Sequence, residues 1–232
     1  MIKPGELPFT LKILRNSQIK SLLKRLHMSN YQLGDWLYFR QFDKFQEDFF
    51  TINAPNIFLD GYFQCERYFR DCRTELVEQF RPSYEMEAPC KKVLEQIKSC
   101  NSVALHVRRG DFQQSSHRFH YLLSKDYYRR AMAYIKERVD DPQFFWFSED
   151  FDWIHENFGN KKEFHFVKTK TANADIDDVM LMKNCNHIIT ANSSFSWWGA
   201  WLNEHDDAIR IVPDKEFVPE GSIPETWVKL PV

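Results

Sequence analysis

The residues of this chain best suited to chemistry form the run His106-Val107-Arg108-Arg109-Gly110-Asp111. The residues just before it, 102–105, have the composition of a β-strand, and alternation along a strand places His106 and Arg108 on one face and Val107 and Arg109 on the other. Ligands of open α/β sheets bind beyond the carboxyl ends of the strands, and a planar arginine fork takes two phosphate oxygens at once. The run therefore indicates a diphosphate site, with a solvated arginine pair in a surface turn as the alternative.

The tripeptide Arg109-Gly110-Asp111 is also the sequence that cell-adhesion receptors bind. Adhesion loops need exposed flanks and usually a secreted, disulfide-linked setting. Here the tripeptide closes an apolar strand, and the first residues lack the pattern of a secretion signal. The sequence therefore favours the diphosphate site over an adhesion module.

Composition indicates a folded globular protein. Of the 232 residues, 43% are hydrophobic and 16% aromatic, which is enough to bury a substantial core. The formal net charge is only −2, and the charges of both signs are interspersed, which argues against a nucleic-acid-coating role. The five cysteines are odd in number and form no CxxC pair, so we expect neither a zinc site nor a disulfide framework. A reducing cytoplasm is the expected location.

No run of about eighteen apolar residues is present, so we expect no membrane span. Residues 11–26 follow a basic amphipathic pattern, in which leucines alternate with lysines and arginines at helical spacing. Such a helix can lie on an anionic membrane surface, so peripheral membrane contact is one expectation for this segment. A helix with an ordinary solvated face is the alternative, and it is the commoner situation.

The second part of the chain alternates between strand and helix patterns. Strands are predicted at 102–106, 144–147, 163–167, 187–190 and 209–212, and helices at 124–139, 148–159, 177–185 and 195–202. Ser124 and Asp126 are the capping candidates of the first of these helices. Repeated β-α units with short connections predict an α/β fold with a parallel, doubly wound sheet.

The first part of the chain is less regular. It holds the amphipathic segment, an aromatic stretch at 31–50, a strand and turn at 57–62, and a predicted helix at 64–80. No complete independent sheet can be derived from it. The organisation changes near Arg81-Pro82-Ser83, so we expect a partial N-terminal domain at 1–85 and a complete C-terminal domain at 86–232.

A second group of candidate residues is Asn192-Ser193-Ser194-Phe195, which is followed by a tryptophan-rich run to Trp201. The serines fall between a predicted strand and a predicted helix. Unpaired N–H groups and the positive end of the helix dipole favour anions there. Helix capping by Asn192 or Ser194 is the alternative, but the loop of the serines lies at the same sheet edge as Arg108. The tryptophans are expected mainly to pack in the core.

Asp177 or Asp178, at the start of a predicted helix, could accept hydrogen bonds from the N1–H and amino edge of guanine, with helix capping as the alternative. The triplets Asp150-Phe151-Asp152 and Asp175-Ile176-Asp177 match the loose DxD pattern of metal-dependent sugar transferases, but such triplets arise by chance in an aspartate-rich chain. The histidines His117, His120 and His165 lack a ligand set. No metal site or cofactor is therefore expected.

Several of these motifs occur together in the order and spacing of a known family. They are the HVRRGD run, the Lys125-Asp126-Tyr127-Tyr128 helix start, Phe145-Trp146-Phe147-Ser148-Glu149-Asp150, Asp178 with Leu181-Met182, and NSSFSWWGAWLN. From about Phe58 to its end, the chain closely resembles the α-1,2-fucosyltransferases of glycosyltransferase family 11. The tryptophan-rich motif is the most specific part of this resemblance.

The resemblance implies a GT-B-like fold of two facing Rossmann-like domains, of which the C-terminal one binds GDP-fucose. It implies inverting, metal-independent transfer of L-fucose to the 2-hydroxyl of a terminal galactose in a glycan acceptor. Carried over by position, His106 and Asp178 face the guanine, Arg108 holds the β-phosphate, and Ser193, Ser194 and Phe195 line the nucleotide. The substrate-binding set also includes Arg109 and Ser148, which belong to the shared motifs. The catalytic set is Arg108 with Asp111, which is the candidate base for the acceptor hydroxyl, with a structural role beside an arginine as the alternative.

The chain departs from the family at its start. The family begins with a strand and a Gly-Gly-Leu-Gly-Asn-Gln-Met-Phe-Gln-Tyr type segment, whereas Gly34 is the only glycine between Gly5 and Gly61 here. The alternative to an active transferase is therefore a truncated, catalytically inactive remnant that binds a GDP-sugar. The spacing of the motifs also does not distinguish fucose from another GDP-linked sugar.

Overall fold

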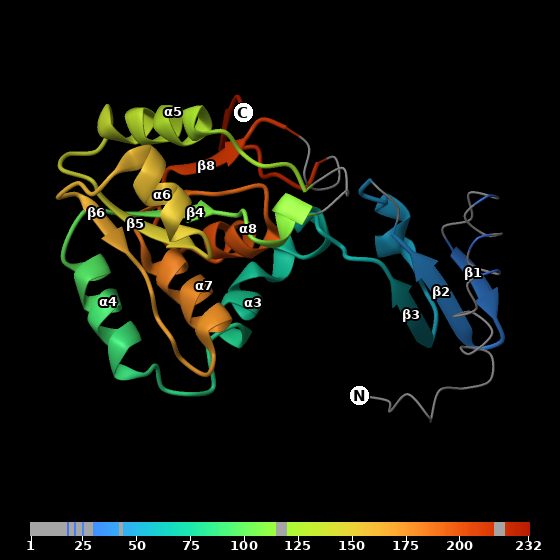
Figure 1. The fold of residues 1–232 in the computed structure, drawn as a ribbon. Helices are drawn as coiled ribbons and strands as arrows, with labels where there is room; N and C mark the ends of the chain where they lie inside the picture. Colours follow the sequence, from blue (N-terminus) through green and yellow to red (C-terminus); the bar gives the residue numbers. More distant parts are fainter. Residues whose placement is uncertain are drawn as a thin grey trace. The chain divides into compact units, whose positions relative to one another are not determined.

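The computed structural model describes residues 18, 21, 25, 30–41, 44–114, 120–215 and 221–232. The chain forms two compact units, residues 1–70 with 219–222 and residues 71–218 with 223–232 (Figure 1). The amphipathic segment 11–26, apart from residues 18, 21 and 25, lies outside the described residues. Among the helices that are described, none is long and apolar enough to cross a membrane.

The second unit is built on one sheet of six strands, all parallel, in the order β6-β5-β4-β7-β8-β9. The strands are β4 (Ser102–Val107), β5 (Gln143–Ser148), β6 (Phe164–Phe166), β7 (His187–Ile189), β8 (Arg210–Pro213) and β9 (Val228–Leu230). The first five confirm the predicted strands. β9 was not predicted, since its three residues Val228-Lys229-Leu230 are too few to give a pattern of their own.

Helices cover both faces of this sheet, which confirms the doubly wound α/β class. They are α4 (Ala88–Lys98), α5 (Lys125–Lys136), α6 (Phe151–Phe158), α7 (Ala174–Asn184) and α8 (Ser194–Trp201). α5 and α6 lie on one face, α4 and α7 lie on the other, and α8 packs against α7 (Figure 1). The helix α4 was not among the predicted elements, whereas the other four were.

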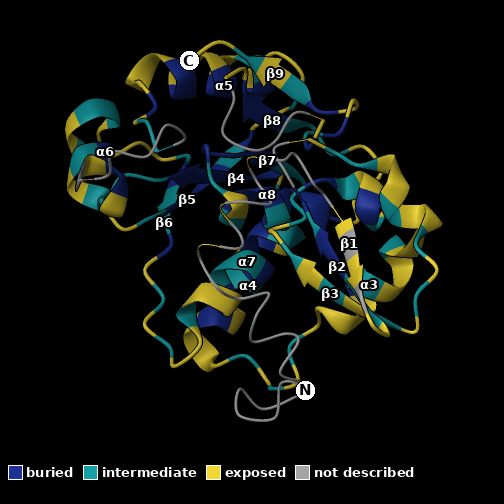
Figure 2. Ribbon diagram, turned by 90° about the vertical axis from the view of Figure 1, so that its right-hand side faces the viewer, coloured by how far each residue is buried: buried dark blue, intermediate teal, exposed yellow. Residues whose placement is uncertain are grey.

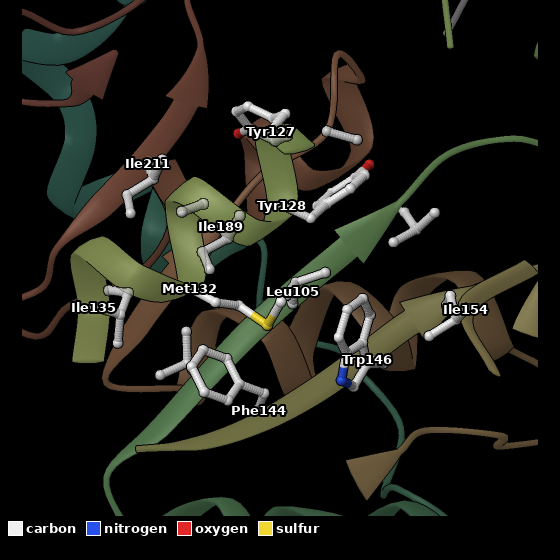
Figure 3. Close-up of a cluster of buried hydrophobic side chains, with 14 of the residues drawn as sticks. Leu105, Tyr127, Tyr128, Met132, Ile135, Phe144, Trp146, Ile154, Ile189 and Ile211 are labelled. Carbon is white, nitrogen blue, oxygen red and sulfur yellow. The ribbon is translucent and has the colours of Figure 1, made fainter. Parts of the chain in front are cut away.

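The core between the sheet and α5 is large and aromatic (Figure 3). Leu105 from β4 and Trp146 from β5 meet Tyr128 and Ile135 from α5, and all four side chains are almost completely buried. Every residue of β4 is buried, as the strands at the centre of Figure 2 show. A strand that is apolar on both faces is the pattern expected for the middle of a parallel sheet.

Local signals fix the ends of the helices around the sheet. The hydroxyl of Ser124 accepts a hydrogen bond from the N–H of Tyr127 at 3.3 Å and begins α5, as predicted. The carboxylate of Asp150 does the same for Trp153 at 3.1 Å and begins α6. α6 ends at Gly159, whose φ of +71° lies in the left-handed region that glycine tolerates.

The first unit contains a sheet of three strands: β1 (Asn30–Leu33), β2 (Trp36–Arg40) and β3 (Asn56–Asp60). β1 and β2 form an antiparallel hairpin that turns at Gly34, and β3 runs parallel to β2. The strand predicted at 57–62 is therefore confirmed as β3. The aromatic stretch supplies a cluster of rings in which Phe49 contacts Phe39, Phe63 and Tyr68, with centroids 5.2 to 5.6 Å apart.

The prediction of a helix at 64–80 is wrong over the first half of that range. Two 3₁₀ turns, η2 (Glu66–Tyr68) and η3 (Arg70–Cys72), precede a shorter helix α3 (Arg73–Gln79). The cause lies at Cys65, which is fully buried in an extended conformation with φ −145° and ψ 125°. The compact units divide at residue 70, earlier than the boundary at 85 suggested by the sequence, because α3 packs on the second unit.

Within the second unit, α3 is held against the carboxyl end of α8. Arg73 donates hydrogen bonds to the carbonyls of Trp201 and Asn203 at 3.0 and 2.9 Å. Arg210, from β8, donates to the carbonyl of Ala200 at 3.1 Å and to the side chain and carbonyl of Asn203 at 2.8 and 3.1 Å. Two guanidinium groups therefore satisfy carbonyls at the negative end of the α8 dipole.

We predict that Arg210→Met lowers the free energy of unfolding by about 2 to 4 kcal/mol, because several buried carbonyls lose a charged donor at once. Urea unfolding followed by circular dichroism measures this. Arg129→Met is the control, since Arg129 is exposed and pairs with Asp126 on the surface of α5 at 3.3 Å. The control is expected to change stability by less than about 1 kcal/mol, and equal losses in both variants would contradict the capping role of Arg210.

Candidate active site

The order of the strands changes direction at β4. β5 and β6 extend the sheet on one side of β4, and β7, β8 and β9 extend it on the other. The segment after β4 leads to α5 on one face of the sheet, while the segment after β7 leads to α8 on the opposite face. In open α/β sheets such a switch point, beyond the carboxyl ends of the strands, is where ligands bind. Arg108 follows β4 and Ser193 follows β7, so both lie at this point.

Arg108 is held by carboxylates from two segments. Its Nη1 donates to Oε1 of Glu149, which follows β5, and its Nη2 lies 2.9 Å from Oδ1 of Asp111. Its guanidinium also lies over the ring of Phe112, 5.6 Å from the centroid. The side chain remains 25% exposed. A guanidinium with this exposure and fixed direction can take up an anion at the sheet edge.

Arg109 has a different set of contacts. Its Nε donates to Oδ2 of Asp150 at 3.2 Å, and its guanidinium lies over the ring of Trp153, 4.3 Å from the centroid. Only 16% of its side chain is exposed. Arg109 therefore fastens the end of β4 to α6, and its engagement with Asp150 also disfavours the adhesion tripeptide.

The predicted alternation is confirmed for His106, Val107 and Arg109. Val107 packs in the core that faces α5, and Arg109 reaches α6 on the same face. His106 turns the other way, where its ring lies 5.4 Å from the ring of Phe195 in α8. This contact joins the end of β4 to the first turn of α8.

His106 is 4% exposed. Burial, with a smaller contribution from the charge of Arg108, lowers the pKa of His106 to about 3. The imidazole is therefore neutral at neutral pH, with one ring nitrogen as a donor and the other as an acceptor. Its Nδ1 is buried and has no hydrogen-bond partner among the residues that the structure describes. A buried polar atom of this kind is suited to a ligand.

The first turn of α8 presents its polar groups at the same edge. Ser193 caps the helix, since its hydroxyl accepts from the N–H of Phe195 at 3.3 Å, while Ser194 is exposed. Thr190, just after β7, is fully buried, and its hydroxyl has no partner within the described part of the chain. The Nδ2 of Asn192 donates to the carbonyl of Tyr121 at 2.7 Å, which anchors the loop. The cap is therefore Ser193, whereas the capping alternative named Asn192 or Ser194, and Ser194 remains accessible.

Asp177 and Asp178, in the first turns of α7, lie in different surroundings. Asp177 is fully buried and accepts hydrogen bonds from the hydroxyls of Tyr84 and Thr171 at 2.8 and 2.6 Å. Asp178 is partly exposed and accepts one from Thr169 at 3.1 Å. Burial raises the pKa of Asp178 to about 6, against which the Thr169 bond acts. Asp178 is therefore the better of the two for an external donor.

The side chain of Ser148 forms hydrogen bonds within the protein, at the ends of β4 and β5. Its hydroxyl donates to the carbonyl of Val107 at 2.9 Å and accepts from the N–H of Asp150 at 3.0 Å. These two bonds use its donor and one acceptor position to join the ends of β4 and β5. The geometry thus gives Ser148 a role in positioning the segments that carry Arg108 and Glu149.

Glu149 was not singled out by the sequence, although it contacts the guanidinium of Arg108. The signal that could have found it is its place, directly after a buried strand that pairs with β4. Its carboxylate also lies against Gly110, where a Cβ would be only 2.6 Å from Oε2. Any other residue at position 110 would displace Glu149 from this place.

His120, His165 and one aspartate of each DxD triplet make contacts within the protein. His120 stacks on Phe112, and His165 stacks on Phe145, with centroids 4.3 and 4.7 Å apart. Within the described ranges, no three His, Cys, Asp or Glu side chains cluster as metal ligands would. His117 lies outside the described residues. Asp150 and Asp177, one from each triplet, are occupied by the protein contacts given above.

A parallel sheet with its switch point at β4 and β7 defines an open, doubly wound α/β domain. The sequence pattern of glycosyl transferase family 11 matches residues 6–230. The chain therefore belongs to this family, which confirms the resemblance seen in the sequence.

Three relatives illustrate the similarity. The chain is 36% identical over 181 residues to an alpha-1,2-colitosyltransferase of Escherichia coli, an alignment that covers 73% of this chain and 61% of that protein. It is 31% identical over 183 residues to the O-antigen biosynthesis glycosyltransferase WbnK of Escherichia coli, covering 74% and 60%. It is 27% identical over 210 residues to galactoside alpha-(1,2)-fucosyltransferase 1 of Aotus azarae, covering 83% and 57%. The chain thus matches about three fifths of the length of these relatives.

The shifted pKa values of His106 and Asp178 have opposite effects on how stability changes with pH. Between pH 3 and 6.5 an unfolded chain protonates His106 and the folded chain does not, so this group makes stability rise with pH. Between pH 3.8 and 6 the folded chain keeps a proton on Asp178 that the unfolded chain loses, so this group makes stability fall with pH.

We therefore predict that, relative to wild type, His106→Leu lowers the slope of unfolding free energy against pH between pH 4 and 6, while Asp178→Asn raises it. Each slope is expected to change by roughly one proton per molecule. Urea titrations at several pH values measure both slopes. Parallel curves for the three proteins would contradict the assigned shifts.

Proposed function

We propose that this chain binds a GDP-linked sugar where β4 and β7 end and transfers the sugar to a glycan. The sugar is L-fucose, the acceptor is the 2-hydroxyl of a terminal galactose, and the transfer inverts the anomeric carbon without a metal ion. The observation that carries this proposal is the adjacency, at one sheet edge, of a partly exposed arginine after β4 and the amino end of α8 after β7.

The diphosphate is the part of the donor that these groups suit best. The fork of Arg108 matches phosphate oxygens in geometry and charge. The first turn of α8 offers N–H groups and the positive end of a helix dipole, and Ser194 adds an exposed hydroxyl. We assign the β-phosphate to Arg108 and the neighbouring phosphate to the start of α8.

The guanine is assigned to His106, Asp178 and Phe195. The support is the unpaired Nδ1 of His106 and its ring contact with Phe195, on the face of the sheet that α7 and α8 cover. An ionised carboxylate at Asp178 would accept from both donors of the guanine edge. Ser193 holds the start of α8 in place through its cap.

The chemistry follows from this arrangement. The acceptor 2-hydroxyl oxygen attacks C1 of the sugar from the face opposite the nucleotide, the bond from C1 to the diphosphate oxygen breaks, and the hydroxyl proton passes to a base. The leaving diphosphate gains negative charge in the transition state, and a fixed guanidinium stabilises that charge. Asp111 acts through Arg108 as a positioning residue, since it contacts Nη2 at 2.9 Å.

The first unit is proposed as the remaining part of an acceptor-side domain in a GT-B-like arrangement. This assignment rests on family membership and on the sheet of β1, β2 and β3. Galactose is proposed because a relative is named a galactoside fucosyltransferase, while the name of another relative makes colitose the first competing donor sugar. A cytoplasmic location and membrane contact through residues 11–26 stay predictions from the sequence.

We predict that Arg108→Ala weakens GDP binding about 10- to 100-fold, because one charged, bidentate donor set is lost. GMP binding is expected to change little, so the preference for GDP over GMP disappears. Calorimetry with both nucleotides measures this. Arg138→Ala, which removes a surface arginine paired with Glu137, is the control and is expected to bind GDP normally. Unchanged GDP affinity in a folded Arg108→Ala variant would contradict the assignment.

Activity is tested with GDP-fucose and GDP-colitose as donors, each offered to a β-galactoside and to its 2-deoxy analogue. We expect α-linked product from the galactoside only, in the presence of a chelator, with Arg108→Ala slowing transfer by about 100-fold or more. Nuclear magnetic resonance of the product gives the linkage and the anomer. Tight GDP binding without product from either donor would select the alternative, a GDP-sugar-binding protein without transferase activity.

A further inference from the structure

Glu149 contacts the two groups after β4 that a phosphate would use, the guanidinium of Arg108 and the backbone at Gly110. Its Oε1 accepts from the Nη1 of Arg108, and its carboxylate covers Gly110, the position where the absence of a side chain lets another group approach the backbone. Asp111, in contrast, contacts the other end of the same guanidinium from its own turn, at Nη2. Glu149 follows a different strand, β5, and its side chain is 55% exposed.

The local charge balance is unfavourable for an anion while Glu149 stays in place. Two guanidiniums, Arg108 and Arg109, face three carboxylates, Asp111, Glu149 and Asp150. With Glu149 the group carries a net charge of −1, and without it the charge is zero. Because more than half of its side chain is exposed, Glu149 can move into water at small cost, whereas Asp150 is tied to Arg109 and to the cap of α6.

We propose that Glu149 is a placeholder for the diphosphate: Glu149 holds Arg108 before nucleotide binds and is displaced from it by the diphosphate. The proposal rests on the proposed function, because it needs a diphosphate on Arg108. After transfer, the return of Glu149 to Nη1 of Arg108 assists release of the nucleoside diphosphate. Glu149 is thus a positioning residue that limits how tightly the product is held.

The expected effect of Glu149→Gln is therefore a gain of affinity. An amide keeps the size of the side chain but no longer competes as a charge, so GDP should bind about two- to fivefold more tightly, the range expected for loss of one partly exposed ion pair. The change should come mainly from slower dissociation. A residue that only supported the fold would give weaker binding or none when altered.

The test compares wild type, Glu149→Gln, Arg108→Ala and the double variant by calorimetry with GDP and by stopped-flow dissociation of a fluorescent GDP analogue. Glu137→Gln is the matched control, since Glu137 is an exposed glutamate paired with Arg138 at the far end of α5. The control is expected to bind as wild type does. The gain from Glu149→Gln should vanish in the Arg108→Ala background, because the two side chains act through one contact.

The outcomes separate the two proposals. If wild type binds no GDP, or if Arg108→Ala binds as wild type does, the proposed function fails and the placeholder fails with it. If Arg108→Ala weakens binding but Glu149→Gln leaves GDP affinity unchanged or reduced, only the placeholder is overturned. A gain that persists without Arg108 also overturns it, since the effect would then be a general change of surface charge.

Discussion

The burial of β4 along its whole length is the constraint on which the rest of the second unit depends. A strand covered on both faces can carry polar chemistry only where it ends. His106 is the last buried polar residue of β4. Arg108, directly after the strand, is the first polar residue that reaches solvent. The neighbouring strands β5 and β7 end at the same edge, so they supply Glu149 and the start of α8 to one small region.

The two adjacent arginines show how one strand end can serve both structure and ligand. Alternation sends Arg109 to α6, where Asp150 and Trp153 enclose it, and leaves Arg108 at the edge with carboxylates that are mostly exposed. The first arrangement contributes stability because its partners are themselves fixed. The second can change partners, which is what binding and release of an anion require.

Much of this could be predicted from the sequence, for identifiable reasons. The strands β4 and β5 and the helices α5 and α6 carry strong local signals, such as continuous apolar runs, the Ser124 cap and Gly159 at a helix end. The 3₁₀ turns before α3 could not be foreseen, because the extended backbone of Cys65 is set by burial. Glu149 was missed since its partner lies 41 residues away, across a strand pair.

The two guanidiniums on the carboxyl end of α8 have a consequence for what holds this helix in place. A helix of eight residues is far too short to persist alone in water. Its negative end is completed by Arg73, from the first turn of α3, and by Arg210, from β8. The eight residues of α8, and the amino end that they present at the sheet edge, therefore depend on segments that precede and follow the helix along the chain.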